Sequence, residues 1–281
     1  MTSELTHDVA ERAQDYLAAY GRPVDAAWVR QMRGAASGDD VRAELEPYQN
    51  PDGGFGQAFE PDISAPDSNP FAARLAMQVL LAIETPADAP ICQRLADWLQ
   101  TAQDSSGDWP FVQGVYQHPL APWFAAWTFP SLNPALCIGG AAARLGIGAP
   151  EMHERVRTLA NRLAQPDEIA NASFYNLLPY AEYFPWIDHP QRDEMLDRIA
   201  RKIEANARGD GYEDAEHFFT HLGPASGELA RRVSRAAIDA QLDRLLAAQE
   251  ADGGWPTPYS LHWRSWSTAT AVAILRDFGR L

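Results

Sequence analysis

One short motif recurs along this chain of 281 residues: a glutamine, then glycine four positions later and an aromatic residue six positions later. Complete copies lie at 49–55, 103–109 and 249–255, and a degenerate copy with a shifted glycine lies at 206–212. Each copy follows a stretch in which apolar residues recur with the period of a helix. Because glycine readily ends a helix and tolerates a tight turn, the repeat predicts pairs of helices joined at similar corners.

The rest of the sequence fits an all-helical chain. No segment alternates apolar and polar residues in the way a half-buried strand does. Periodicity, capping residues and prolines predict helices at about 4–20, 24–37, 39–48, 67–84, 88–103, 131–146, 150–165, 171–184, 190–206, 226–249 and 265–279, with a shorter one at 213–222. We therefore expect one all-α domain over 1–281, in which about six helical hairpins close into a ring.

The charge and composition exclude several classes of partner. Lysine and arginine number 23 against 38 aspartates and glutamates, so the net charge is −15 and a nucleic-acid partner is not expected. No apolar stretch reaches the roughly 18 residues that a transmembrane segment needs, and residues 1–15 show no signal peptide. The two cysteines, Cys92 and Cys137, lie in apolar helical contexts, which predicts reduced thiols and a cytoplasmic location.

The complete corners resemble the QW repeat of squalene and oxidosqualene cyclases, which class II terpene cyclases and protein prenyltransferase β-subunits share in looser form. The resemblance runs from Leu45 to Leu281, although only the corners match closely. It implies an α/α toroid whose inner helices surround a central cavity. We expect the corner glutamines to bond backbone groups left open at the end of the neighbouring helix and the aromatic rings to fill the grooves between hairpins, as structural elements.

The same resemblance directs attention to the helix that follows the first corner. Cyclases begin this helix with an Asp-x-Asp-Asp motif whose middle aspartate protonates an alkene, but this chain has Asp67-Ser-Asn69-Pro70 there. Just upstream, Glu60-Pro-Asp62 places two carboxylates beside a rigid proline, and like charges close together raise one pKa. Asp62, Glu60 and Asp67 are therefore the candidate acids. Capping of the helix near Pro70 is the alternative role for Asp62 or Asp67.

Aromatic residues gather in the inserts between paired helices, where they would line an apolar pocket or pack between hairpins. The candidate substrate-binding residues are Trp123, Trp127, Trp263, Trp266, Phe71, Tyr175 and Arg264. No phosphate-binding loop or dinucleotide motif is present, so we expect no cofactor; Mg²⁺ would be needed only for a diphosphate substrate.

A second polar group follows the degenerate corner. It contains Glu213, Asp214 and Glu216, followed by His217 and His221, which would share one face of a helix. The glutamate that directly follows the first histidine in zinc hydrolases is absent, which favours a histidine pair without metal. Protein prenyltransferases bind zinc through an Asp-x-Cys pair and a distant histidine. Cys137 has no such aspartate, so we expect it to pack within a helix.

Three functions remain open. The leading one is a terpene-cyclase-like toroid that binds an isoprenoid or similar apolar ligand, with proton-initiated cyclisation or isomerisation as its chemistry. The second is a non-catalytic binding toroid that has lost the Asp-x-Asp-Asp acid, which Asn69 and Pro70 support. The third is a carbohydrate-active toroid that uses paired carboxylates, Glu60 or Asp62 against Glu213 or Asp214.

Overall fold

The regular elements of the chain are helical, as the sequence predicts. The computed structural model describes residues 3–281, with side chains from residue 8 onward. Within that range the only extended pairings are two isolated bridges, Gln49 with Phe55 and Ile63 with Leu120. None of the helices described is both long and apolar enough to cross a bilayer. Both cysteines are free and buried.

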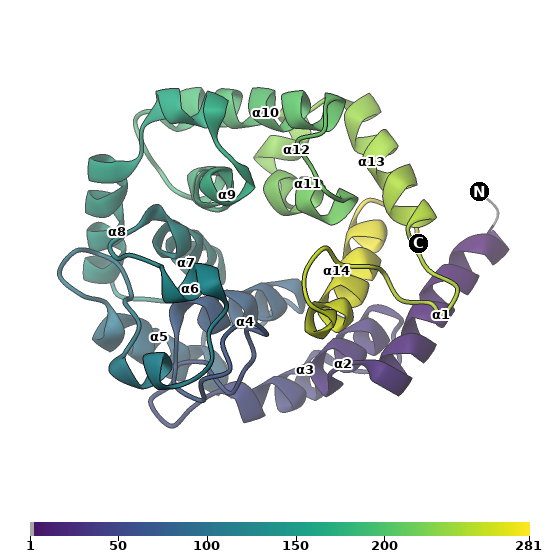
Figure 1. The fold of residues 1–281 in the computed structure, drawn as a ribbon, viewed down its shortest axis with the longest axis horizontal. Coiled ribbons are helices and arrows are strands. Elements are labelled where there is room, and N and C mark those ends of the chain that lie inside the picture. The colour runs from purple at the N-terminus through teal and green to yellow at the C-terminus, as the bar shows by residue number, and fades with distance from the viewer. Residues whose placement is uncertain (1–2) are drawn as a thin grey trace. The chain divides into compact units, whose positions relative to one another are not determined.

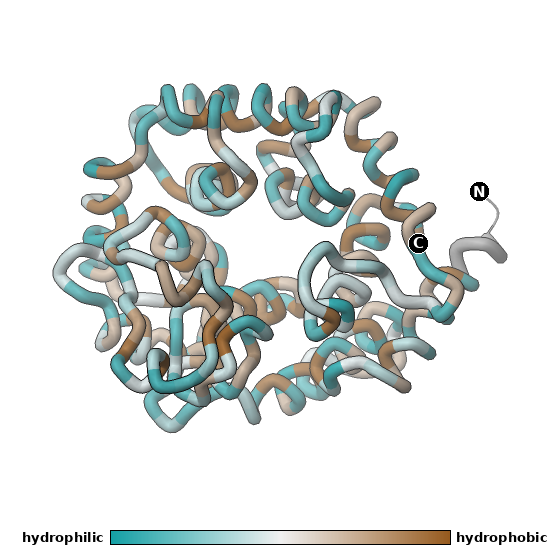
Figure 2. Tube along the Cα trace, in the orientation of Figure 1, coloured by the Kyte–Doolittle hydropathy of each residue, from teal (hydrophilic) through white to brown (hydrophobic). Residues whose placement is uncertain are grey.

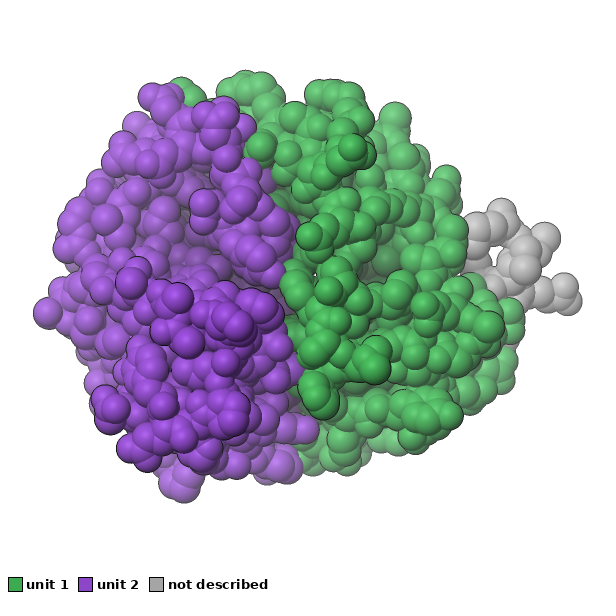
Figure 3. Space-filling view, in the orientation of Figure 1, with its two compact units in different colours: residues 1–44, 196–281 green, residues 45–195 purple. Residues whose placement is uncertain are grey.

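Two compact units make up the chain, and Figure 3 draws them in different colours. Unit 1 combines the described residues up to Glu44 with Leu196–Leu281, and unit 2 is Leu45–Met195. The helices of unit 1 are α1 (Ser3–Tyr20), α2 (Pro23–Met32), α3 (Gly38–Leu45), α10 (Arg192–Arg208), α11 (Ala215–Leu222), α12 (Glu228–Arg232), α13 (Arg235–Ala247), η5 (Leu261–Trp263) and α14 (Arg264–Asp277). The last residue of α3 and the first four of α10 belong to unit 2. Those of unit 2 are η1 (Glu46–Tyr48), α4 (Pro70–Ala82), α5 (Pro90–Ala102), η2 (Gln113–Gln117), α6 (Pro122–Ala125), α7 (Leu132–Leu145), α8 (Pro150–Leu163), η3 (Pro166–Asn171), α9 (Phe174–Tyr183) and η4 (Phe184–Trp186).

Local sequence explains most helix boundaries. The fixed φ of proline suits the first helical position, where its missing N–H costs nothing. Helices α2, α4, α5, α6 and α8 all begin on such a proline. The apolar stripe predicted for the helix before the second corner is confirmed, because Ile91, Leu95, Trp98 and Leu99 of α5 are all buried. Helix α10 buries one face in the same way, and Figure 2 shows polar and apolar residues alternating along it.

The helix predicted at 226–249 is wrong as a single element. It is divided into α12 and α13 by Val233 and Ser234, both of which have extended backbone angles. The backbone N–H of Ser234 donates a 2.7 Å hydrogen bond to the carboxylate of Glu204 in α10. Because the Ser234 N–H bonds a residue of another helix, it is not available to a continuous helix over 226–249, and the break falls at Ser234.

The first corner joins its own turn to α5, the second α-helix after it in the chain. Gln49 Nε2 donates one hydrogen bond to the carbonyl oxygen of Gly53 and a second to that of Ile91 in α5, each 2.9 Å long. Arg94, one turn further along α5, donates from Nε to Gln49 Oε1 at 2.7 Å. The Ile91 carbonyl lies within the helix rather than among the unpaired groups at the helix end. The glutamine N–H therefore donates to the second lone pair of the Ile91 carbonyl oxygen.

The other complete corners repeat these three bonds with different helices. Gln103 donates to Gly107 (3.1 Å) and to Met152 of α8 (3.2 Å) and accepts from Arg155 (2.6 Å). Gln249 donates to Gly253 and to Val9 of α1 (both 2.9 Å) and accepts from Arg12 (2.5 Å). The last corner therefore binds the first helix of the chain just as the earlier corners bind the helices that follow them.

Glycine at each corner is required twice over. Gly53, Gly107 and Gly253 have φ angles of 91°, 94° and 92°, in the region that side chains disfavour. A Cβ atom at these positions would lie 2.1–2.4 Å from the carbonyl oxygen of the same arginine that bonds the glutamine. The aromatic residue completes the corner: Trp109 and Trp255 donate from Nε1 to carbonyls ten residues earlier, and Phe55 is fully buried.

Helices α4, α7 and α9 pack together inside unit 2, with α7 between the other two (Figure 1). The approach of α7 to α9 is close because Gly140 carries no side chain. A Cβ atom there would lie 2.0 Å from the carbonyl oxygen of Glu182. The tight approach brings the few polar side chains of these helices within reach of one another.

The second corner contains a buried carboxylate. Asp108 is fully buried and accepts hydrogen bonds from the backbone N–H groups of Trp109 (2.8 Å) and Ser131 (2.7 Å). Burial raises the pKa of Asp108 from 3.8 to about 6, against the opposing effect of these two N–H groups. At neutral pH Asp108 is therefore ionised in a buried position that favours its protonated form, and this lowers the stability of the folded state.

We expect Asp108 to make the protein less stable as pH rises from about 4 to about 6. In that window the folded state holds a proton that the unfolded chain has lost, so the free energy of unfolding falls by up to about 3 kcal/mol. Urea unfolding across pH 4–7 should therefore show the wild type losing stability relative to Asp108→Asn as pH rises, so that the gap (wild type minus variant) falls by up to about 3 kcal/mol. The exposed Asp97→Asn variant is the control. A gap for Asp108→Asn that is independent of pH would contradict the assignment.

Candidate functional site

The predicted acids lie in the loop that enters α4. Glu60 is buried, with 5% of its surface exposed, and its Oε1 accepts the backbone N–H of Asp62 at 3.3 Å. Asp62 is half-buried, and its carbonyl oxygen accepts the N–H of Ala121 at 3.1 Å. Ser64 donates to the carbonyl of Pro119 at 2.8 Å. The loop is therefore held against the insert that contains the predicted tryptophans.

Asn69, the residue at the cyclase acid position, caps α4. Its Oδ1 accepts the N–H of Ala72 at 2.9 Å, and its backbone has the extended conformation typical of a cap. The capping role considered for Asp62 or Asp67 therefore belongs to Asn69. Asp67 is half-buried, and its carboxylate lies against Gly114, where an added Cβ would approach Oδ1 to 2.2 Å.

An aromatic cluster lies beside this loop. We call it the Phe71 cluster; it consists of Ile63, Ala65, Phe71, Phe111, Val115 and Phe124, with Leu120, Ala121, Trp127 and Phe129 packed against it. The ring centroid of Phe71 lies 4.5 Å from that of Phe124 and 4.9 Å from that of Trp127. Trp123 is 51% exposed at the edge of the cluster, 6.4 Å from Phe124. The structure thus brings together three of the residues predicted to bind substrate.

A largely buried ion pair, with side chains 14% and 18% exposed, begins one turn beyond Phe71. Arg74 of α4 pairs with Glu182 of α9 through two hydrogen bonds, one of them from Nε to Oε2 at 2.9 Å, and Gln78 approaches the same carboxylate. Although burial disfavours the charged guanidinium, the carboxylate of Glu182 holds the pKa of Arg74 above its usual value. The charge of Glu60 makes a further, smaller contribution to the raised pKa of Arg74.

The remaining predicted residues lie elsewhere in the two units. Trp266 is buried in unit 1 against Trp28, with ring centroids 5.9 Å apart. Arg264 bonds Glu250 and Asp252 and covers the ring of Tyr16, so it supports the third corner. The ring of Trp263 lies 5.8 Å from that of Tyr259 in unit 1. Tyr175 in unit 2 is 49% exposed beside Phe174.

The histidine pair is bonded to tyrosines. His217 Nε2 lies 2.7 Å from the hydroxyl of Tyr259, and His221 Nδ1 lies 3.0 Å from the hydroxyl of Tyr212. Among the side chains that the structure describes, no three histidines, cysteines or carboxylates are placed to hold a metal ion. Cys137 is buried in α7, and burial raises the pKa of its thiol.

Sequence reasoning missed Glu182 and the phenylalanines Phe111 and Phe124. A signal for Glu182 was present, because it is the only charged residue of α9 and Arg74 is the only charged residue of α4. Opposite single charges on two otherwise uncharged helices favour a buried pair, since neither can be buried alone without a large cost.

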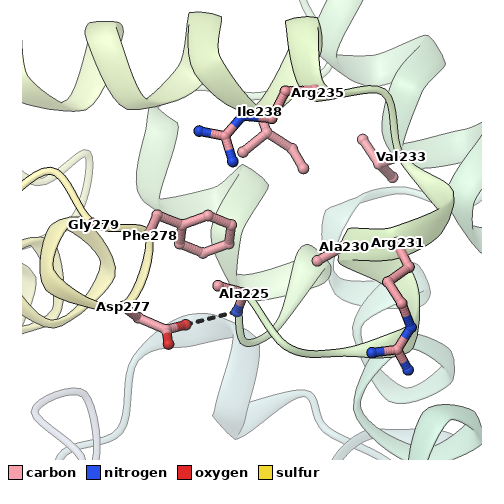
Figure 4. Close-up of a pocket in the computed structure, with 9 residues that line it drawn as sticks. All are labelled: Ala225, Ala230, Arg231, Val233, Arg235, Ile238, Asp277, Phe278 and Gly279. Atoms are coloured by element: carbon pink, nitrogen blue, oxygen red, sulfur yellow. Dashed lines mark hydrogen bonds between the residues drawn. The ribbon is translucent and has the colours of Figure 1, made fainter.

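A cavity of about 600 Å³ lies in unit 1 between α12, α13 and the end of α14 (Figure 4). It is lined by Ala225, Ala230, Arg231, Val233, Arg235, Ile238, Asp277, Phe278 and Gly279, none of which is a predicted site residue. Its charged groups are engaged within the protein: Arg231 pairs with Glu228, Arg235 with Asp239, and Asp277 accepts the N–H of Ala225. This cavity therefore gives no indication of a particular ligand.

Comparison with known proteins identifies a shared fold. No protein-family model and no curated protein matches the sequence. A crystal structure of a protein from Actinoplanes is similar with a TM-score of 0.60 and 14% sequence identity, over 98% of this chain and 99% of that chain. At this identity the similarity concerns the fold alone.

We expect the Arg74–Glu182 pair to show strong coupling in a double-mutant cycle. Glu182→Met leaves a buried guanidinium without its main partner, which should lower the free energy of unfolding by about 3 kcal/mol. Arg74→Met should cost a similar amount, and the double variant less than the sum of the two. Urea unfolding measures all three, with Arg157→Met in the exposed Arg157–Glu154 pair as the control, expected to cost less than about 1 kcal/mol. Simple additivity at Arg74 and Glu182 would refute the coupling.

Proposed function

We propose that the chain is an α/α toroid of the terpene-cyclase and prenyltransferase type that binds an isoprenoid or similarly apolar molecule. The corner contacts support the ring: Gln49 binds α5, Gln103 binds α8, and Gln249 binds α1. A series of hairpins whose last corner binds the first helix has the connectivity of a closed ring. Similarity to the Actinoplanes structure supports the fold, not the ligand.

The observation that carries the ligand class is the insert at 109–130. It contains no aspartate, glutamate, lysine or arginine, although the chain as a whole is strongly charged. Val112, Tyr116 and Trp123 of this insert are 45–51% exposed, next to the packed Phe71 cluster. Exposed apolar groups beside a buried aromatic cluster offer favourable contacts to an apolar ligand and few to a charged one.

Binding without cyclisation is the second candidate, and the loop before α4 favours it. The amide of Asn69 cannot donate the proton that an alkene requires, and its oxygen is used to cap α4. Glu60 is only 5% exposed, and its Oε1 already accepts the backbone N–H of Asp62, whereas Asp62 itself is half-buried. If this chain protonates an alkene from this loop, we assign the donor to Asp62 before Glu60 or Asp67.

Ligand titration tests the proposal. We expect linear prenyl alcohols of 15–30 carbons to quench the intrinsic tryptophan fluorescence of the full chain, with calorimetry giving the affinity. Trp123→Ala, a change at a half-exposed side chain, should weaken binding by about tenfold because a large aromatic contact is lost. Tyr20→Ala, at a tyrosine of α1 that is 74% exposed, is the matched control.

Two outcomes would overturn the proposal. Failure of every prenyl alcohol to bind, and of prenyl diphosphates with and without Mg²⁺, would exclude the ligand class. Binding that is unaffected by Trp123→Ala would exclude the insert as the site. Binding of oligosaccharides in place of prenyl chains would favour the carbohydrate-active alternative.

A further inference from the structure

Three polar side chains in unit 1, those of Asp214, His217 and Tyr259, lie next to one another in an arrangement that the proposed function does not use. Asp214 caps α11 and accepts the backbone N–H of His217 at 2.8 Å. The same oxygen, Oδ1, lies 3.3 Å from His217 Nδ1, and His217 Nε2 lies 2.7 Å from the hydroxyl of Tyr259. The order of the chain is carboxylate, imidazole, phenol.

The carboxylate assigns the protons along this chain. The Asp214 oxygen 3.3 Å from Nδ1 favours the tautomer with its hydrogen on Nδ1, and in that tautomer the lone pair of Nε2 accepts the hydroxyl proton of Tyr259. In the same way, a carboxylate next to one ring nitrogen orients a histidine as a base toward a hydroxyl group, although the side chain of Asp214 is 30% exposed. The cap at the start of α11 thus fixes both the position and the tautomer of the histidine.

Burial keeps the imidazole in the form that accepts a proton. His217 is 8% exposed, and burial lowers its pKa, while the nearby carboxylates of Asp214 and Glu213 oppose that change and Arg244 adds to it. Glu216, also on α11, bonds Ser267 of α14 and stays outside the chain. Histidine is therefore mainly neutral at pH 7 and can receive the Tyr259 proton.

Tyr259 is placed to react, in contrast to the other histidine-bonded tyrosine. It is half-buried between the rings of His217 and Trp263, with centroids 5.7 and 5.8 Å away. Tyr212, the partner of His221, is only 5% exposed, and burial raises its pKa. The two pairs share the same chemistry, but only Tyr259 has a substantial exposed surface.

We propose that Tyr259, His217 and Asp214 form an acid–base triad that removes a proton from the carbon next to a carbonyl group in an apolar ligand. In the step the C–H bond breaks and its proton joins the Tyr259 oxygen, while the phenol proton passes to His217 Nε2. The electron pair stays on the ligand as an enolate, and nothing is oxidised or reduced. Return of the proton to another carbon isomerises the ligand.

The carbonyl requirement follows from the strength of the groups. A phenol and an imidazole are weak acids, with ordinary pKa values of about 10 and 6.5. They suit a C–H bond that a neighbouring carbonyl has made acidic, and they are far too weak to protonate an isolated alkene. This inference rests on the proposed function only for the apolar character of the ligand. The arrangement of the triad does not depend on the proposed function.

Labelling with an aryl sulfonyl fluoride tests the triad without a substrate. The Tyr259 oxygen attacks sulfur, the S–O bond forms, fluoride leaves, and His217 takes the proton. Peptide mass spectrometry of the full chain at pH 7 should show Tyr259 reacting at least about tenfold faster than Tyr20, Tyr116 or Tyr175, although these are 45–74% exposed. The Tyr259 rate should level off above the pKa of His217, whereas the control rates keep rising toward pH 10.

Two variants separate reactivity from structure. Asn is as good a helix cap as Asp, so Asp214→Asn should preserve α11 and its thermal stability while lowering the labelling rate several-fold. His217→Gln should reduce the rate to that of the exposed controls. Labelling of Tyr259 no faster than Tyr20, or unchanged in Asp214→Asn, would overturn the triad. Because no prenyl ligand is used, failure of the proposed function leaves this result unaffected.

Discussion

The side-chain amide of a corner glutamine is the contact on which the rest of the structure depends. Each amide uses both N–H donors and its oxygen at once, to its own turn, to a carbonyl of another helix and to an arginine of that helix. Each hydrogen bond contributes about 0.5–1.5 kcal/mol to stability. For the fold, the positions of the three partners matter more than the summed energy of the three bonds. A planar amide with three fixed partners sets where the next helix lies, and the glycine without a side chain lets it approach.

Helices held at fixed places can carry polar groups in apolar surroundings. In unit 2 the close packing of α4, α7 and α9 places Arg74 against Glu182 next to the Phe71 cluster. In unit 1 the start of α11 places Asp214, His217 and Tyr259 in line. Burial of such groups is costly unless each finds its partner, so they occur where the scaffold is rigid enough to provide one. These are the two places at which we locate binding and proton transfer.

Much of the fold could be predicted from the sequence because its signals are local. The corner motif, the proline starts and the apolar stripe of α5 can each be recognised from residues close together in the chain, although the arginines and carbonyl groups that the corner glutamines bond are distant in sequence. The break between α12 and α13 could not be predicted, since it depends on Glu204 of another helix. The site was harder for the same reason. Phe71 and Trp127 were both expected to bind substrate and do meet. The pairing of Glu182 with Arg74 had a signal in the sequence, whereas the pairing of Tyr259 with His217, 42 residues apart, is revealed only by the folded chain. The closed ring and the ligand remain predictions.

Hydrogen exchange across the three corners tests the central claim most directly. If each glutamine fastens one helix, Gln249→Ala should lower the protection of the amides of α1, Gln103→Ala that of α8, and Gln49→Ala that of α5. Gln117→Ala, at an exposed glutamine outside these helices, is the control. Loss of protection confined to the partner helix in each variant is the expected result. Unchanged protection of α1 in Gln249→Ala, or a loss spread evenly over all helices, would contradict the account.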